Sequence, residues 1–387
     1  MPSNLATPQQ SFLCFRDWFV EKALPLWTKQ SYDHARGGFY EALNFDGAPA
    51  IGLAKRVRVQ SRQIYTLTEA GVRGWHNDAE ALAAKGFDFF LNTACPDDGA
   101  RGCVHLLSED GKVIDDRRDL YDQAFLLLAC ASRWKAARDD RALALADKVA
   151  SFLDRELGSS FGGWTEDDRG TLPRRQNPHM HLFEAFTALY EATGQKQWLN
   201  SATKILELMR SVFFDPGRGV LREFFDREMK FLTDRTAVEP GHMFEWVWLL
   251  RNYQRHSQAD LAALRRTLFS RGAELGEDPD FYGFIGNEIS VSANPGRADK
   301  RLWPQTEYIK ACLAQAGDGD PDARRRAAQL INDLFETYLD TPTPGLWIDE
   351  YDITGAAIAP HVPASILYHM FEAVVETADS INAGDAS

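Results

Sequence analysis

Cysteine and long apolar runs are both scarce in this sequence. Its five cysteines are scattered and never spaced as CxxC, which predicts neither a disulfide framework nor a zinc cluster. No stretch approaches about 18 uninterrupted apolar residues, and the first residues, MPSNLATPQQ, lack the basic start and apolar core of an export signal. We therefore expect no membrane span and a cytoplasmic location.

Positively charged residues are also fewer than negatively charged ones. The chain carries 43 Lys and Arg against 56 Asp and Glu, a formal net charge of -13 that repels nucleic acid and anionic membrane surfaces. Aromatic residues are plentiful at 12%, and such ring density suits either a deep core or a carbohydrate pocket, because flat rings cover the apolar C–H faces of sugars. We expect a small-molecule partner rather than nucleic acid or a membrane.

Apolar residues recur at helical spacing through most of the chain, and short turn-rich segments separate the periodic stretches. This spacing predicts about twelve helices, each of roughly 12 to 20 residues. The predicted helices are 11–30, 55–71, 78–91, 117–137, 141–157, 177–194, 197–214, 241–256, 261–275, 305–316, 323–339 and 362–378.

These helices arrive in pairs, and short strand-like pieces around Asp-Gly turns, such as residues 96–116, lie between them. No residue-level repeat is obvious. Paired helices stack either as an open solenoid or as a closed ring. Polar and ionisable residues gather at one end of alternate helices, and in a ring those ends converge. We therefore predict an all-α fold, an (α/α)6 barrel with short β-hairpin inserts, as one domain over 1–387 with flexible ends at 1–10 and 380–387.

Histidines stand at the beginnings of three predicted helices, each site close behind a proline. They are His179 and His181 in NPHMHLFEAF, His242 in PGHMFEW and His361 in APHVPASILYHM. A helix N-terminus opposes the protonated form of histidine, so we expect lowered pKa values and neutral imidazoles that can act as general bases near pH 7. The other histidines lack this arrangement and are interpreted as structural or solvent-facing: His34, His76, His105, His256 and His369.

Charged residues that could take part in chemistry also stand at two helix starts. His242 and Glu245 project from the same face of one helical turn, although a pair of this kind alone commonly caps a helix. Arg58 and Arg62 share a face at i, i+4 near another helix start, where an inward arginine can hold a sugar oxygen or stabilise enolate charge.

Metal binding is an alternative use of the same residues. His181 with Glu184 and His242 with Glu245 form two H-x-x-E pairs, and inward Glu and His at three-residue spacing can build a dinuclear site. The order is inverted relative to the usual E-x-x-H, and further carboxylates at matching places are not evident. We therefore predict a site without metal.

Four motifs in order resemble the N-acylglucosamine 2-epimerase superfamily: YDQAFLLLA from Tyr121, NPHMHLFEAFTALYE from Asn177, EPGHMFEWVWLL from Glu239 and LWPQTEYIKA from Leu302. The resemblance covers about 62–361, most of the chain. It implies an (α/α)6 barrel that epimerises or isomerises sugars through a cis-enediol, without metal or any other cofactor.

The resemblance also implies roles for individual residues. His242 and His361 match the paired acid/base histidines, Glu245 would orient His242, and Arg62 would hold the reacting oxygens of the substrate. The residues that it implies for sugar binding are Asn177, His179, Trp303 and Glu307, and we also expect Tyr121 and Arg58 to bind the sugar.

The predicted activity is an aldose-ketose isomerase acting on a free hexose, D-mannose to D-fructose. The basic residues from Lys55 to Arg62, with Arg174 and Arg175, leave a phosphorylated or sulfonated sugar open. The alternative of the same class is a 2-epimerase acting on glucose and mannose, N-acylglucosamine or cellobiose. A glycoside hydrolase or lyase on an (α/α) barrel is an alternative of another class, but it needs a carboxylate pair where this sequence has histidines. A non-catalytic sugar-binding barrel is a further alternative. The oligomeric state stays open, a homodimer being one option.

Overall fold

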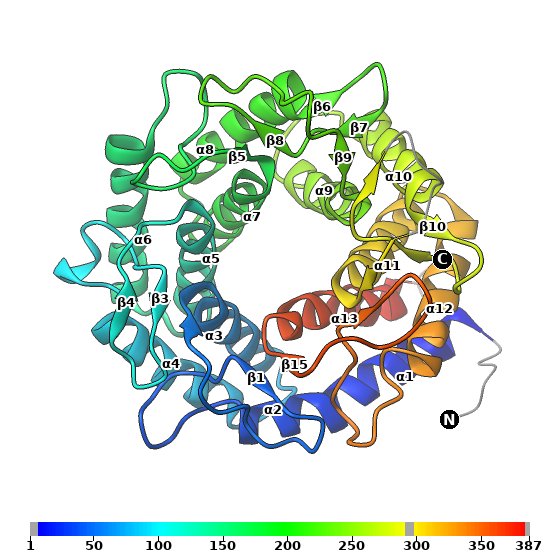
Figure 1. Ribbon diagram of the computed structural model, residues 1–387, viewed down its shortest axis with the longest axis horizontal. Coiled ribbons are helices and arrows are strands. Elements are labelled where there is room, and N and C mark those ends of the chain that lie inside the picture. The colour runs from blue at the N-terminus through cyan, green and yellow to red at the C-terminus, as the bar shows by residue number, and fades with distance from the viewer. Residues whose placement is uncertain (1–6, 291–297, 384–387) are drawn as a thin grey trace.

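Two concentric rings of helices surround a central axis in the computed structural model, which describes residues 7–290 and 298–383 (Figure 1). The inner helices are α3 (Val57–Val72), α5 (Leu120–Ala137), α7 (Gln176–Thr193), α9 (Pro240–Gln254), α11 (Leu302–Gly317) and α13 (Ile366–Ala383). The outer helices are α1 (Pro8–Trp18), α4 (Ala79–Thr93), α6 (Asp140–Phe152), α8 (Lys196–Leu208), α10 (Ala262–Gly276) and α12 (Pro321–Glu336).

Each inner helix contacts the next along the chain, and α13 contacts α3, which closes the ring. Each inner helix also contacts an outer partner, α3 with α4 and so on to α13 with α1. This is the predicted (α/α)6 barrel. Three outer helices end in a π-helical turn: α1 in η1 (Phe19–Ala23), α6 in η3 (Leu153–Leu157) and α8 in η4 (Met209–Phe213). After η1 the chain continues as a further helix, α2 (Leu24–Gln30). A separate 3₁₀ turn, η2 (Asp97–Gly99), follows α4.

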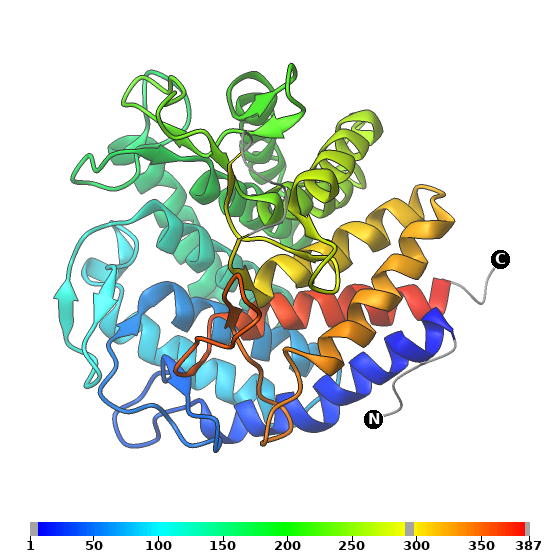
Figure 2. The same ribbon diagram turned by 45° about the vertical axis from the view of Figure 1, so that its right-hand side comes forward.

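Short antiparallel strands lie in the loops before the inner helices. They pair as β1 (Ala42–Leu43) with β15 (Val362–Pro363), β2 (Lys55–Arg56) with β3 (Leu106–Leu107), β3 with β4 (Val113–Asp115), β5 (Arg174–Arg175) with β8 (Phe224–Phe225), β6 (Phe214–Asp215) with β7 (Val220–Leu221), β9 (Ala237–Val238) with β12 (Ile289–Ser290), β10 (Glu277–Asp278) with β11 (Phe284–Ile285), and β13 (Lys300–Arg301) with β14 (Glu350–Tyr351). The oblique view shows these loops on one side of the ring (Figure 2).

The inner helices are buried on nearly all faces, whereas the outer helices bury one stripe. The apolar periodicity of the sequence predicted both inner and outer helices, because both have apolar residues at helical spacing. The prediction of helical ends was confirmed at Gly194, which caps α7 with a φ of 71° that favours glycine. It was wrong at Lys55 and Arg56, which form β2, and at Val362, which belongs to β15 rather than to the last helix.

The predicted flexible ends fall partly outside the described residues, which exclude 1–6 and 384–387. Within them, α1 begins at Pro8 with a capping box from Thr7 and Gln10, and α13 continues to Ala383. Among the described helices, none combines the length and apolar character that crossing a membrane requires.

Candidate functional site

A cavity of about 200 Å³ lies where the inner helices begin. Every inner helix contributes to its wall, from its first two turns or from the residues directly before it. The lining residues are Arg56, Arg58, Arg62, Tyr121, Asn177, His181, Glu239, His242, Glu245, Arg301, Trp303, Ser365, Ile366 and His369. Most of the predicted site residues are among them. The predicted residues that do not line it are His179, Glu307 and His361.

His242 is buried in the first turn of α9, between two carboxylates. Its Nδ1 lies 3.1 Å from Glu223 Oε2 and 3.5 Å from Glu239 Oε2. Burial disfavours the imidazolium, but the carboxylates of Glu239 and Glu223 outweigh it and raise the pKa of His242 to about 10. This corrects two expectations. The ring is held by Glu223 rather than Glu245, and the carboxylates override the helix terminus that was expected to lower the pKa.

Trp303 connects His242 to a second histidine, His369. The indole ring lies with its centroid 5.2 Å from the ring of His242 and 5.8 Å from that of His369. Close approach of α9 and α11 requires Gly241, because a Cβ there would lie 2.6 Å from the Trp303 ring. The predicted position of Trp303 beside this cavity therefore depends on a glycine in the neighbouring helix.

His369, which the sequence interpretation set aside as structural, lies in the first turn of α13 and lines the cavity. Its Nδ1 lies 2.8 Å from Glu307 Oε1, and Glu307 is ion-paired with Lys310 at 2.8 Å. A carboxylate held by an ammonium accepts, so Nδ1 carries the hydrogen and Nε2 keeps its lone pair. Burial, reinforced by the positive charge of Arg62, lowers the pKa of His369 well below its usual value, leaving a neutral imidazole.

A four-residue pattern could have identified His369. The sequence reads HLFE from His181, HMFE from His242 and HMFE from His369, each at the start of an inner helix. All three histidines line the cavity. The repeat is short and spread over three helices, and no longer sequence repeat accompanies it.

His181 is the third histidine of the cavity. Its Nδ1 lies 2.9 Å from Glu184 Oε2 and its Nε2 3.7 Å from Glu245 Oε1. Burial lowers the pKa of His181 in spite of Glu184. Glu245, predicted to orient His242, thus lies against His181, and burial together with the charge of Glu307 raises the pKa of Glu245 well above its usual value.

Arg62 extends from α3 into the cavity without a carboxylate partner among the described residues. It donates to Tyr121 Oη at 2.8 Å and to the carbonyl of Ser365 at 3.4 Å. Its guanidinium lies 4.1 Å from the centroid of the Phe125 ring. A buried guanidinium held in this way keeps its charge available for an anionic oxygen.

Asn177 lines the cavity from the start of α7, as predicted. Its Oδ1 is buried and has no hydrogen-bond partner in the part of the chain that the structure describes. A buried unsatisfied carbonyl is costly, so this oxygen is suited to accept a hydrogen bond from a ligand hydroxyl.

His179 has a structural position that the sequence did not predict. Its Nε2 accepts from the Trp164 amide at 3.1 Å and its Nδ1 lies 3.0 Å from the carbonyl of Arg175. Gly163 packs on the ring, where a Cβ would lie 2.4 Å from Nε2. Burial lowers the pKa of His179 to about 3. Both ring nitrogens contact backbone groups, and His179 does not line the cavity where the sequence analysis expected it.

His361 also lies away from the cavity. It directly precedes β15, is only partly buried, and its Nδ1 lies 3.1 Å from Asn44 Oδ1. The expectation that it stands at a helix start is wrong, because β15 pairs with β1 and delays α13 to Ile366. Glu307, predicted to bind sugar, lies behind His369 and is fully buried.

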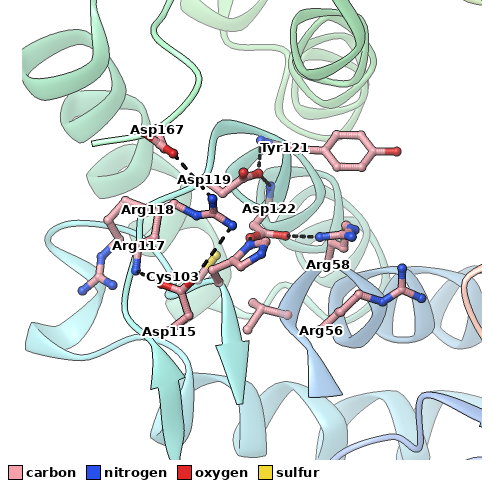
Figure 3. Close-up of polar contacts among 12 residues, drawn as sticks. Arg56, Arg58, Cys103, Asp115, Arg117, Arg118, Asp119, Tyr121, Asp122 and Asp167 are labelled. Atoms are coloured by element: carbon pink, nitrogen blue, oxygen red, sulfur yellow. Dashed lines mark hydrogen bonds and ion pairs between the residues drawn. The ribbon is translucent and has the colours of Figure 1, made fainter. Parts of the chain in front are cut away.

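A second cavity, of about 430 Å³, adjoins the first, and Arg58 and Tyr121 line both. Figure 3 shows Arg58 facing Asp122, at 3.5 Å, while Arg56, Arg58 and the Tyr121 ring all extend away from the cluster around Arg117. The Arg117 guanidinium lies between Asp115 and Asp167, at 3.8 and 3.7 Å. Arg58 therefore stands on the boundary of the two cavities.

Three groups around the first cavity have the residue types of a metal site, with one potential ligand atom per residue within 4.8 Å of one another. They are His181, Glu184 and Glu245; Glu223, Glu239 and His242; and Glu245, Glu307 and His369. The Nδ1 atoms of the three histidines already contact carboxylates. These contacts give the carboxylates a role in orienting and charging imidazoles.

Comparison with known proteins identifies a matching family and several relatives of this chain. A sequence model described as N-acylglucosamine 2-epimerase (GlcNAc 2-epimerase) matches residues 38–373. The chain is 36% identical to a mannose-6-phosphate isomerase from Rhizobium meliloti, over 94% of this chain and 96% of the relative. It is 30% identical to a D-mannose isomerase from Thermobifida fusca, over 83% of each, and 26% identical to a cellobiose 2-epimerase from Ruminococcus albus, over 87% and 89%.

Solved structures share the fold. A sugar epimerase from a ruminal bacterium superposes with a TM-score of 0.86 at 20% identity, covering 96% of this chain and 99% of the other. A D-mannose isomerase superposes with a TM-score of 0.85 at 19% identity, covering 95% and 98%. The chain therefore belongs to the N-acylglucosamine 2-epimerase family of sugar isomerases and epimerases.

Proposed function

From membership of this family, we propose that the chain is an aldose-ketose isomerase that interconverts D-mannose and D-fructose, or their close derivatives. The observation that carries the proposal is the pair His242 and His369. Both border one cavity on either side of Trp303, one charged and one neutral. A general acid and a general base are then available at the same pH.

The proposed reaction starts from the open-chain aldose. Nε2 of His369 takes the proton from C2, and the electrons of that bond form a double bond between C1 and C2. The electrons of the C1 carbonyl move to O1, which receives a proton from His242. In the second half, His242 takes the proton of O2 and His369 returns its proton to C1. One hydrogen has then moved from C2 to C1 and one from O2 to O1, which gives the ketose.

Arg62 is proposed to stabilise the charge that develops on the oxygens of the enediol. It reaches the cavity from α3 and has no carboxylate partner among the described residues. An arginine that is already held by Tyr121 and by a backbone carbonyl loses little freedom when the charge appears. Asn177, with its unsatisfied Oδ1, is proposed to bind a sugar hydroxyl.

The 2-epimerase alternative differs only in where the proton returns. A histidine on the other side of the substrate would deliver it to the opposite face of C2, and His181 is a third imidazole in the same cavity. The relatives support the isomerase: those named isomerases are 36% and 30% identical, whereas the cellobiose 2-epimerase is 26% identical. Glycoside hydrolases share the fold only, at 13% identity and a TM-score of 0.70 for a family 76 enzyme.

Product analysis tests the proposal directly. The protein is incubated with D-mannose, or with mannose 6-phosphate, in deuterated water, and the products are followed by NMR. We expect fructose, or its 6-phosphate, with deuterium at C1. Glucose carrying deuterium at C2 would replace the isomerase with the epimerase, and no conversion of any hexose or hexose phosphate would reject both.

Chelation tests the metal alternative. Because the proposed steps use only imidazoles and a guanidinium, the rate should not change after treatment with EDTA. A loss that a divalent cation restores would assign the carboxylate-histidine groups to metal binding instead.

A further inference from the structure

Three basic dipeptides occupy equivalent positions in the ring. Lys55-Arg56 forms β2, Arg174-Arg175 forms β5 and Lys300-Arg301 forms β13, and an inner helix starts at the next residue in each case. The first member of each dipeptide is buried and donates to backbone carbonyls of nearby loops. The second member is partly exposed, with side-chain fractions of 36%, 38% and 37% for Arg56, Arg175 and Arg301.

Each of these second arginines is held by a carboxylate from another loop. The amide and Nε of Arg56 both donate to Glu41, and those of Arg175 donate to Glu166 in the same way. Nη2 of Arg301 donates to Asp349 at 3.1 Å, and its amide donates to an asparagine side chain. A guanidinium has five N–H donors, so each arginine is fixed in place with donors remaining.

The three arginines differ in the cavity that they line. Arg56 and Arg301 line the reaction cavity, whereas Arg175 lines the second cavity. Burial raises the pKa of Asp349, and the charges of Arg301 and Arg56 both oppose that rise, so both guanidiniums lie near one carboxylate. His242 and His369, to which we assign the carbonyl chemistry, are buried, whereas Arg56 and Arg301 are partly exposed and lie toward the entrance.

Arginines outnumber carboxylates among the residues that line this cavity. Its lining includes four arginines, two of them at the entrance, and two carboxylates, Glu239 beside His242 and Glu245 beside His181. Concentrated positive charge at a partly desolvated entrance favours an anion, and planar guanidiniums bind phosphate through paired hydrogen bonds.

We propose that Arg56 and Arg301, with Arg58 beside them, form a phosphate subsite at the entrance of the reaction cavity. It takes the phosphate that a hexose carries at the end distant from its carbonyl. This inference rests on the proposed function for the orientation of the sugar, and it names the substrate class: a hexose phosphate in preference to the free hexose.

Binding without turnover separates this inference from the proposed reaction. Reduction of mannose 6-phosphate gives an alditol phosphate that has no carbonyl and cannot isomerise. Calorimetry on the full chain compares it with mannitol. We expect the phosphate to tighten binding about tenfold or more, and Arg301→Ala or Arg56→Ala to remove most of that advantage. Arg301→Lys should keep part of it, because the charge remains and the paired geometry is lost.

Arg175→Ala is the matched control, since Arg175 has the same register, pairing and exposure but lines the other cavity. It should leave the phosphate advantage unchanged. Equal affinity of the wild-type chain for the two alditols overturns the subsite, and so does an equal loss in Arg175→Ala. If the chain binds the alditol phosphate more tightly than mannitol but converts no sugar, the phosphate subsite is retained and the isomerase is rejected. If it converts mannose but binds the two alditols equally, the isomerase is retained and the subsite is rejected.

Discussion

The arginine side and the histidine side of the cavity use carboxylates in different ways. On the arginine side, formed by β2, α3 and β13, Glu41 and Asp349 hold the edges of Arg56 and Arg301. On the histidine side, formed by α7, α9 and α13, every imidazole places Nδ1 against a carboxylate. An arginine stays charged whatever its partner, so its carboxylate only positions it.

A histidine changes charge with its surroundings, and here the balance between burial and the nearby charges decides the outcome. His242 has two, Glu223 and Glu239, and its pKa is raised. His369 contacts one, Glu307, which Lys310 also holds, and its pKa is lowered. The same residue type at equivalent helical positions thus becomes an acid in one place and a base in the other.

Removing the base should have the largest effect. His369→Asn keeps a side chain of moderate size but cannot accept the C2 proton, so kcat should fall by about 10²- to 10⁴-fold. The rate of exchange of the C2 proton with deuterated water should fall in parallel. Circular dichroism confirms folding, and a folded variant with near-normal exchange would remove His369 from the reaction.

Replacing Arg62, which has no carboxylate partner in the described part of the chain, tests the arginine side of the cavity. Arg62→Ala should lower kcat by about 10²- to 10³-fold, because it removes the donor that meets charge on the enediol oxygens. Arg62→Lys should be less impaired, since it retains the charge. If KM rises and kcat is unchanged in both variants, Arg62 binds the ground state and not the developing charge.

Replacing a carboxylate that contacts His242 should shift the pH dependence of the activity more than it lowers the rate at neutral pH. The proposed acid must be protonated, so wild-type activity should be lost as the pH rises through about 10. Glu223→Gln removes one of the charges that raise this pKa, so the alkaline limb should move to lower pH. The variant should be near normal at pH 7 and reduced about tenfold at pH 9 if the pKa falls by about two units. An unchanged limb would mean that His242 is not the titrating acid.

The smallest effect is expected at His361, the histidine that the sequence favoured. It lies outside the cavity and contacts Asn44, so His361→Ala should change kcat/KM by less than about twofold. A reduction comparable with that of His369→Asn would return the second acid/base role to His361 and contradict the assignment made from the cavity.

Periodicity and local motifs determined much of this protein. The pairing of helices predicted the barrel, because each helix must bury an apolar face against a neighbour. Positions at helix starts, such as Arg62, Trp303 and His242, were predicted near the cavity and lie there, since the inner helices all begin at one end of the ring.

Only the tertiary structure decided the electrostatic partners and the second histidine. Glu223 meets His242 from a separate loop, and Glu307 meets His369 across two inner helices that are 62 residues apart at this contact. The pairing of β15 with β1 delays the last helix, so His369 rather than His361 faces the cavity. Helical spacing is a local property that the sequence displays, whereas a pKa depends on charges that folding brings together from distant segments.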